Sequence, residues 1–147
     1  MKQNTRINFK DVISYVLVTA VSILLLTSCA RKFAFNTSQV VPAAEGSVKV
    51  KKDKNNNYNI DLKVNRLADP KRLLPAKEMY LVWMDTEQNG TKNIGQLRTS
   101  SGLLSKTLKS SLETVTPFKP RRFFITAEDD ANLQYPSGVM VLNTSNF

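Results

Sequence analysis

The sequence predicts an all-β domain, an immunoglobulin-like antiparallel β-sandwich of about seven strands, after an N-terminal signal helix. Three observations lead to this prediction. From about Gly46 onward, apolar residues alternate with polar ones, which is the period of a strand with one buried face. Turn-forming residues separate these stretches at short intervals. No long amphipathic helix is visible after the first 28 residues.

The first 28 residues have the organisation of a secretory signal. Residues 1–11 are polar and basic, and residues 12–26 are almost wholly apolar. This apolar run of about 15 residues is shorter than the roughly 20 that a transmembrane helix needs. A charged start, an apolar middle and a small-residue exit are typical of a signal peptide. We therefore expect residues 1–28 to be removed.

Cys29 is the only cysteine, and the chain has no histidine. Neither an internal disulfide nor a metal site of the Cys/His type can form, and we expect no cofactor. Leu26, Thr27, Ser28 and Cys29 resemble the lipobox of bacterial lipoproteins. The resemblance implies cleavage between Ser28 and Cys29, a diacylglycerol on the thiol and an acyl chain such as palmitate on the new amino group. Two or three acyl chains anchor a protein stably in a membrane, whereas a single acyl chain binds only marginally. The alternative is an uncleaved signal anchor with a buried, inert Cys29.

Residues 29–45 are predicted to be a lipidated tether. Residues 31–42 show neither a helical nor a strand period, and a flexible spacer would let the domain clear the headgroups. Phe33 and Phe35 would sit at the membrane interface or pack on the domain. Loss of the signal lowers Lys plus Arg from 21 to 18 and Asp plus Glu from 12 to 11, so the formal charge falls from +9 to +7. This charge suits anionic lipid headgroups or polysaccharides, or it serves solubility alone.

The β-sandwich domain is expected to span residues 46–147. Alternating apolar residues predict a hairpin with one wet and one dry face, joined by a polar turn at residues 53–57, where Asn tolerates positive φ. Residues 71–77 form one helical turn or an irregular crossing. Residues 79–85 are apolar and rich in β-formers, and predict a central strand with Trp83 in the core.

The second half of the domain continues the pattern. Asn89-Gly90 predicts a hairpin turn, and residues 92–99 return as one strand with a bulge or close approach at Gly95. Residues 103–112 are compatible with a strand or a short helix, and we favour a strand. The last strands are expected at residues 121–127 and 138–142, on either side of a loop at 128–136. Without a disulfide, packing around three aromatic residues is expected to hold the sheets together: Trp83, Phe123 and Phe124.

Residues 79–142 contain a Tyr-x-x-Trp strand ending at Trp83, an apolar-Gly pair at Ile94-Gly95, a Phe-x-Thr-x-Glu strand ending at Glu128, and Pro-x-Gly ending at Gly138. In this order they resemble the C-terminal extracytoplasmic domain of anti-sigma-K factor proteins. The resemblance implies a β-sandwich. It does not carry anti-sigma activity, because about eleven residues before the apolar run cannot fold into a sigma-binding domain. Packing and loop capping are the simplest roles for Trp83 and Glu128.

The sequence does not predict an enzyme. Histidine is absent, and no spacing singles out a Ser–Lys pair at Lys106 or a nucleophile elbow at Ser101. Glu128, Asp129 and Asp130 could bind Ca²⁺ or act on glycosides, but a solvated turn is the simpler interpretation.

We therefore expect a lipid-anchored, non-catalytic binding or structural module of the bacterial cell envelope, with an envelope protein as its partner. The alternatives are a sensor-like accessory domain or a lipid-anchored enzyme with an unrecognised site. Export argues against nucleic acid as a partner. Because Ala30 follows Cys29, and no Asp stands there, the resemblance to lipoproteins implies the outer membrane. We expect the domain on its periplasmic face, with the lipid anchor as its membrane contact.

Overall fold

The computed structural model describes Ile13, residues 30–101 and residues 108–147. In these ranges the protein has nine strands and one short 3-10 helix. The elements are β1 (Arg31–Ala34), β2 (Glu45–Lys52), β3 (Tyr58–Asn65), η1 (Pro70–Arg72), β4 (Met79–Thr86), β5 (Thr91–Gln96), β6 (Arg98–Ser101), β7 (Leu108–Thr116), β8 (Pro120–Glu128) and β9 (Val139–Asn143).

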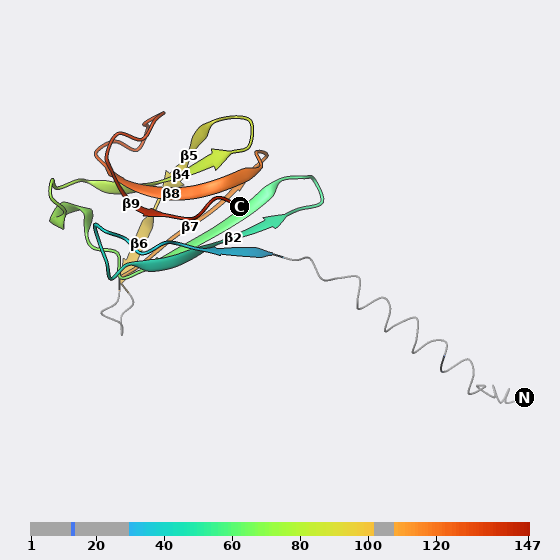
Figure 1. Cartoon of the computed structure of the whole chain (residues 1–147), viewed down its shortest axis with the longest axis horizontal. Coiled ribbons are helices and arrows are strands. Elements are labelled where there is room, and N and C mark those ends of the chain that lie inside the picture. The colour runs from blue at the N-terminus through green and yellow to red at the C-terminus, as the bar shows by residue number, and fades with distance from the viewer. Residues whose placement is uncertain (1–12, 14–29, 102–107) are drawn as a thin grey trace, which may run out of the picture.

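The strands form two antiparallel sheets, which lie as two layers in Figure 1. One sheet has the order β1-β2-β3-β7-β6 and the other the order β5-β4-β8-β9. The apolar residues of both inner faces make one buried core, which includes Val48, Ile60, Leu62, Val82, Met84, Phe123 and Ile125. The prediction of an all-β, two-sheet domain is confirmed. The immunoglobulin-like arrangement of its strands stays a prediction.

The β2–β3 hairpin follows the period-two pattern of its sequence. Val48 and Val50 are buried, and the lysines that alternate with them, Lys49 and Lys51, are exposed. In the turn, Asp53 Oδ1 accepts hydrogen bonds from the backbone N–H groups of Asn55 at 2.8 Å and Asn57 at 2.9 Å. Asn56 has a φ of 64°, the left-handed conformation that Asn tolerates. The predicted hairpin and its turn are confirmed.

The predicted tether is wrong over its first residues, because Arg31–Ala34 form strand β1. β1 pairs with β2 in antiparallel register, with Arg31 opposite Val50 and Phe33 opposite Val48. Phe33 and Phe35 pack against the main core, so they are part of the domain. The folded unit therefore includes residues on both sides of the expected boundary at residue 46. Pairing with the edge of β2 gives the backbone of β1 partners within the protein, whereas the backbone of a flexible spacer bonds to water.

The single strand expected at residues 92–99 is also corrected, because the chain changes sheets within it. β5 lies in the second sheet and β6 in the first, with Leu97 between them. The backbone N–H of Leu97 donates to Tyr80 O at 3.0 Å, and its side chain is buried. Gly95 has a φ of 134°, and the register of β4 and β5 shifts beside it. The bulge predicted at Gly95 is confirmed, and it accompanies the crossing.

Trp83 is fully buried, as predicted, but it does not hold the two sheets together. With Leu81 and Phe124 it forms a second apolar cluster, separate from the main core. Successive residues of a strand point to opposite faces, so Trp83 and Phe124 lie on the outer face of the second sheet, whereas Phe123 lies between the sheets. Leu133 of the loop after β8 packs against this cluster. The predicted role is therefore right for Phe123 and wrong for Trp83 and Phe124.

Candidate binding pocket

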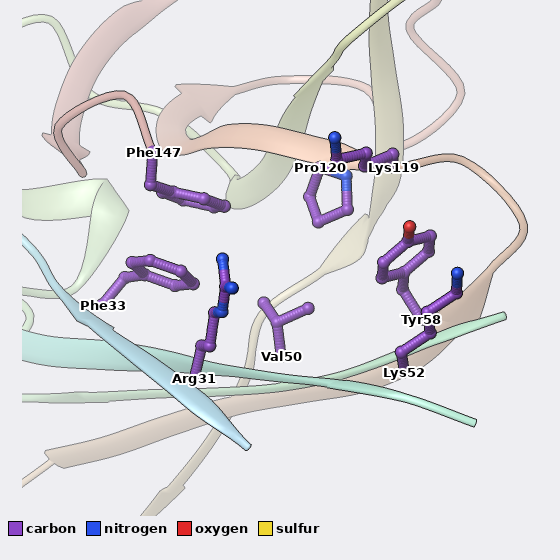
Figure 2. Close-up of a pocket in the computed structure, with 8 residues that line it drawn as sticks. All are labelled: Arg31, Phe33, Val50, Lys52, Tyr58, Lys119, Pro120 and Phe147. Atoms are coloured by element: carbon purple, nitrogen blue, oxygen red, sulfur yellow. The ribbon is translucent and has the colours of Figure 1, made fainter. Parts of the chain in front are cut away.

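A pocket of about 360 Å³ opens at the end of the sandwich where β1 begins, and Figure 2 shows its lining. Residues from both sheets contribute to it. The lining residues are Arg31, Phe33, Val50, Lys52, Tyr58, Lys119, Pro120 and Phe147. Its volume falls near the lower end of the range of small-molecule sites, roughly 300–1,000 Å³. The open end of the sandwich thus offers a concave site for a group of small-molecule size.

Pairing between the strands places the first four of these side chains. Because β1 is antiparallel to β2, Arg31 and Phe33 share the inward face of the sheet with Val50. Lys52 is the last residue of β2 and lies opposite Tyr58, the first residue of β3. The Nζ atom of Lys52 lies 5.8 Å from the centroid of the Tyr58 ring, within range of a cation–π contact. The register of three strands therefore assembles the lower wall of the pocket.

Stacked aromatic rings close the inner end of the pocket. The ring centroids of Phe33 and Phe147 are 3.5 Å apart at an interplanar angle of 12°, and Figure 2 shows the two rings parallel. Behind them the Phe123 ring lies 6.0 Å from that of Phe147. The backbone N–H of Phe147 donates to Arg121 O at 3.0 Å, which ties this residue to β8. A stacked wall that is continuous with the core costs little ordering when a ligand binds.

The charged side chains that line the pocket are all cationic. Arg31, Lys52 and Lys119 line it, and no carboxylate side chain does. Lys119 pairs with Glu87 at 3.0 Å, whereas Arg31 and Lys52 have no ion pair in the described part of the chain. Guanidinium and ammonium groups donate hydrogen bonds and accept none. The arrangement can therefore bind an anion between apolar surfaces.

The acidic cluster singled out in the sequence is dispersed by the fold. Glu128 is buried at the end of β8, whereas Asp129 pairs with Lys77 at 2.6 Å on the surface. Asp130 accepts a hydrogen bond from the backbone N–H of Asn132 at 2.9 Å, within the loop. Ser101 ends β6, and Lys106 lies outside the described residues. Among the described residues, no three acidic or sulfur side chains gather as metal ligands.

Glu128 caps the loop that covers Trp83. Its Oε1 accepts from Thr126 Oγ1 at 2.7 Å and from the backbone N–H groups of Ser137 at 3.0 Å and Gly138 at 2.9 Å. Its Oε2 accepts from Ser137 Oγ at 2.8 Å. Trp83 Nε1 donates to Thr126 Oγ1 at 2.7 Å, which links the indole to the same network. The packing and loop-capping roles expected for Trp83 and Glu128 are confirmed.

These hydrogen bonds set the titration of Glu128. Burial by itself raises the pKa of the carboxyl, but the bonds from Thr126, Gly138 and Ser137 outweigh it and hold the pKa below its ordinary value of 4.5. Because the folded pKa lies below the unfolded one, the ionised carboxylate stabilises the fold. This contribution is complete above about pH 4.5 and is lost as the pH falls through the folded pKa.

We therefore expect the stability advantage of the natural protein over Glu128→Gln to shrink as the medium is acidified. Urea unfolding followed by the fluorescence of the single tryptophan, from about pH 6 to about pH 3, measures it. Glu113→Gln, on the exposed face of β7, is the matched control. A constant difference between the natural protein and Glu128→Gln over this range would contradict the expectation.

Ser28 and Cys29, the residues expected at the cleavage and lipidation site, lie outside the described residues. The described chain resumes at Ala30, and β1 begins at Arg31. No helix in the described part of the chain has the length and apolar character needed to cross a bilayer. Comparison with known proteins found no matching family model, no similar curated protein and no similar solved structure.

Sequence reasoning missed the pocket because its residues come from distant segments. Arg31, Phe33 and Phe35 do alternate with Lys32 and Ala34, which is a period-two signal that could have indicated β1. The contribution of Phe147 had no comparable signal, because it depends on packing against Phe33.

Proposed function

We propose that this protein is a lipid-anchored, non-catalytic binding module of the bacterial cell envelope. The anchor is the lipid carried by Cys29, which becomes the first residue after cleavage between Ser28 and Cys29. The observation that supports this most directly is the start of the fold. β1 begins at Arg31, two residues after Cys29, and is paired with β2 from its first residue. Two residues span at most roughly 7 Å, so an anchor on Cys29 keeps the domain at the membrane surface.

A short connection also orients the domain. The pocket lies where β1 begins, beside the β2–β3 turn, and in Figure 1 the start of the blue strand β1 and this turn lie at the same end of the sandwich. A lipid on Cys29 would therefore hold the mouth of the pocket toward the headgroups. Binding, rather than catalysis, fits the cationic and aromatic lining.

The envelope protein partner expected from the sequence remains part of this proposal. Large exposed apolar side chains among the described residues lie on several elements, and Val139 and Met140 are adjacent on strand β9. β9 is the last strand of its sheet and offers a place for such a partner. The alternatives are a sensor-like accessory domain and a lipid-anchored enzyme. The lining of the pocket favours neither of them over a binding module. Outer-membrane attachment with the domain in the periplasm is proposed with the anchor.

The anchor is tested by metabolic labelling with an alkyne-tagged fatty acid. We expect the natural protein to take up label and Cys29→Ala to take up none, because the thiol carries the diacylglycerol. Mass spectrometry should find a mature chain that starts at Cys29 and carries acyl groups. Ser28→Ala, which keeps a small residue before the thiol, should still be labelled. Equal labelling of the natural protein and Cys29→Ala, or a native chain with residues 1–28 attached and a bare thiol, would overturn the proposal.

A further inference from the structure

We propose that the pocket binds the phosphate headgroup of an anionic phospholipid from the membrane that holds the protein. This inference rests on the proposed function, since the lipid anchor is what brings the pocket to a bilayer. The ligand chemistry is a phosphate ester on a small apolar body. Arg31 and Lys52 are its recognition groups, and the rings of Phe33, Tyr58 and Phe147 line the space around it.

The charges at this end of the sandwich favour an anion. Arg31 and Lys52 point their charged ends into the space between the two sheets in Figure 2, and neither has an ion pair among the described residues. Three more lysines without an ion pair in the described ranges lie nearby in the fold, on β1, on β2 and in the β2–β3 turn: Lys32, Lys51 and Lys54. An anionic membrane surface attracts such side chains, by about 1 kcal/mol for each of them.

The acids nearby form other contacts and are not paired with Arg31 or Lys52. Asp53 is engaged by the backbone N–H groups of Asn55 and Asn57, within the β2–β3 turn. Glu87 pairs with Lys119, the third cation of the pocket, so Arg31 and Lys52 are the two lining cations without an ion pair in the described part of the chain. An Arg guanidinium binds phosphate oxygens through two parallel N–H bonds, and a Lys ammonium adds a point charge.

The apolar lining distinguishes a lipid from a free phosphate ion. Val50 and Pro120 are buried, and the stacked rings of Phe33 and Phe147 continue the apolar surface toward the core. A hydrated inorganic ion gains nothing from these surfaces, whereas the glycerol and the first methylenes of a phospholipid do. Tyr58 places an amphipathic ring at the rim, the kind of side chain that suits a headgroup region.

The test uses the full chain in micelles of an uncharged detergent. It is titrated with a soluble short-chain phosphatidylglycerol and with phosphatidylcholine of the same chain length. Glycerol phosphate and inorganic phosphate are titrated separately, and amide chemical shifts report the site and the affinity. We expect phosphatidylglycerol to shift the amides around Arg31, Lys52 and Tyr58, and to bind more tightly than the other three probes.

Matched variants separate the pocket from general electrostatics. Arg31→Gln and Lys52→Gln should each weaken phosphatidylglycerol binding about fivefold. Arg72→Gln and Lys109→Gln remove the same charges from exposed positions at the other end of the domain, and should leave binding within about twofold. Unfolding midpoints of all four variants show that they are folded, since such surface changes cost about 0.5 kcal/mol or less.

Each contrary result has a definite meaning. Equal losses in the pocket variants and the controls would overturn the site in favour of non-specific attraction. Inorganic phosphate binding as tightly as phosphatidylglycerol would overturn the lipid as the source, and the absence of any shift would overturn the pocket as a binding site. The titration does not depend on the anchor. If Cys29 is bare but phosphatidylglycerol binds in the pocket, only the proposed function is overturned. If Cys29 is lipidated but phosphatidylglycerol does not bind, only this inference is overturned.

Discussion

Phe123→Ala is expected to lower the free energy of unfolding by about 4 kcal/mol, within the range of roughly 3–5 kcal/mol for Phe→Ala substitutions in a core. Phe123 is fully buried between the two sheets, opposite Met84 in the register of β8 and β4. Its removal takes away apolar burial and leaves a cavity that the sheets cannot close. Denaturant unfolding followed by the fluorescence of Trp83 measures the loss.

The same substitution should loosen the pocket. The Phe123 ring lies behind Phe147, whose ring in turn stacks on Phe33. We expect Phe123→Ala to broaden or shift the resonances of both outer rings. Phe118→Ala is the control, because this half-buried ring packs at the turn before β8 and should cost about 1 kcal/mol. Similar losses for the two variants would contradict the placement of Phe123 at the centre of the sheet interface.

Glu128→Ala is expected to lower the free energy of unfolding by about 3 kcal/mol. The substitution leaves four donors without their acceptor: Thr126 Oγ1, Ser137 Oγ and the backbone N–H groups of Ser137 and Gly138. A buried donor that loses its partner costs about 1–3 kcal/mol, and water that enters the loop offsets part of the sum. Denaturant unfolding gives the total, and a red shift of Trp83 emission reports opening of the loop.

The control for this substitution is Glu113→Ala, which removes an exposed carboxylate from the outer face of β7. Its expected cost is about 0.5 kcal/mol or less. Proteolysis should cut Glu128→Ala first between β8 and β9, because the capped loop loses its attachment. The loop passes close to β8 at Gly138, where an added Cβ would collide with the carbonyl oxygen of Ala127. A variant as stable and as protease-resistant as Glu113→Ala would refute the capping role.

The local pattern of the sequence was sufficient for the strands and turns. Alternation from Val48 to Val64 predicts two strands because the strand period is two, whatever the strands pair with. Asn56 and Gly90 occupy the positive-φ positions of their turns, and Gly95 marks a bulge. These features depend on the conformational preferences of single residues and their neighbours.

Pairing between distant segments decided the rest. Alternation separates the two faces of β4, but it does not say that Tyr80 faces the other sheet while Trp83 faces the loop from β8 to β9. The crossing between the sheets at Leu97 likewise involves a distant partner, since the backbone N–H of Leu97 donates to Tyr80 O. Which face is covered, and by what, is a property of the assembled layers.

The sequence by itself therefore determined an all-β chain, its main turns and the residue expected to carry a lipid, Cys29. The tertiary structure alone decided that β1 joins the sheet and that Arg31, Lys52 and Phe147 meet in one pocket. The physical reason is the sequence distance over which each effect acts. Backbone preference and side-chain period act over a few residues, whereas a pocket forms where strands far apart in the chain come to share an end of the sandwich.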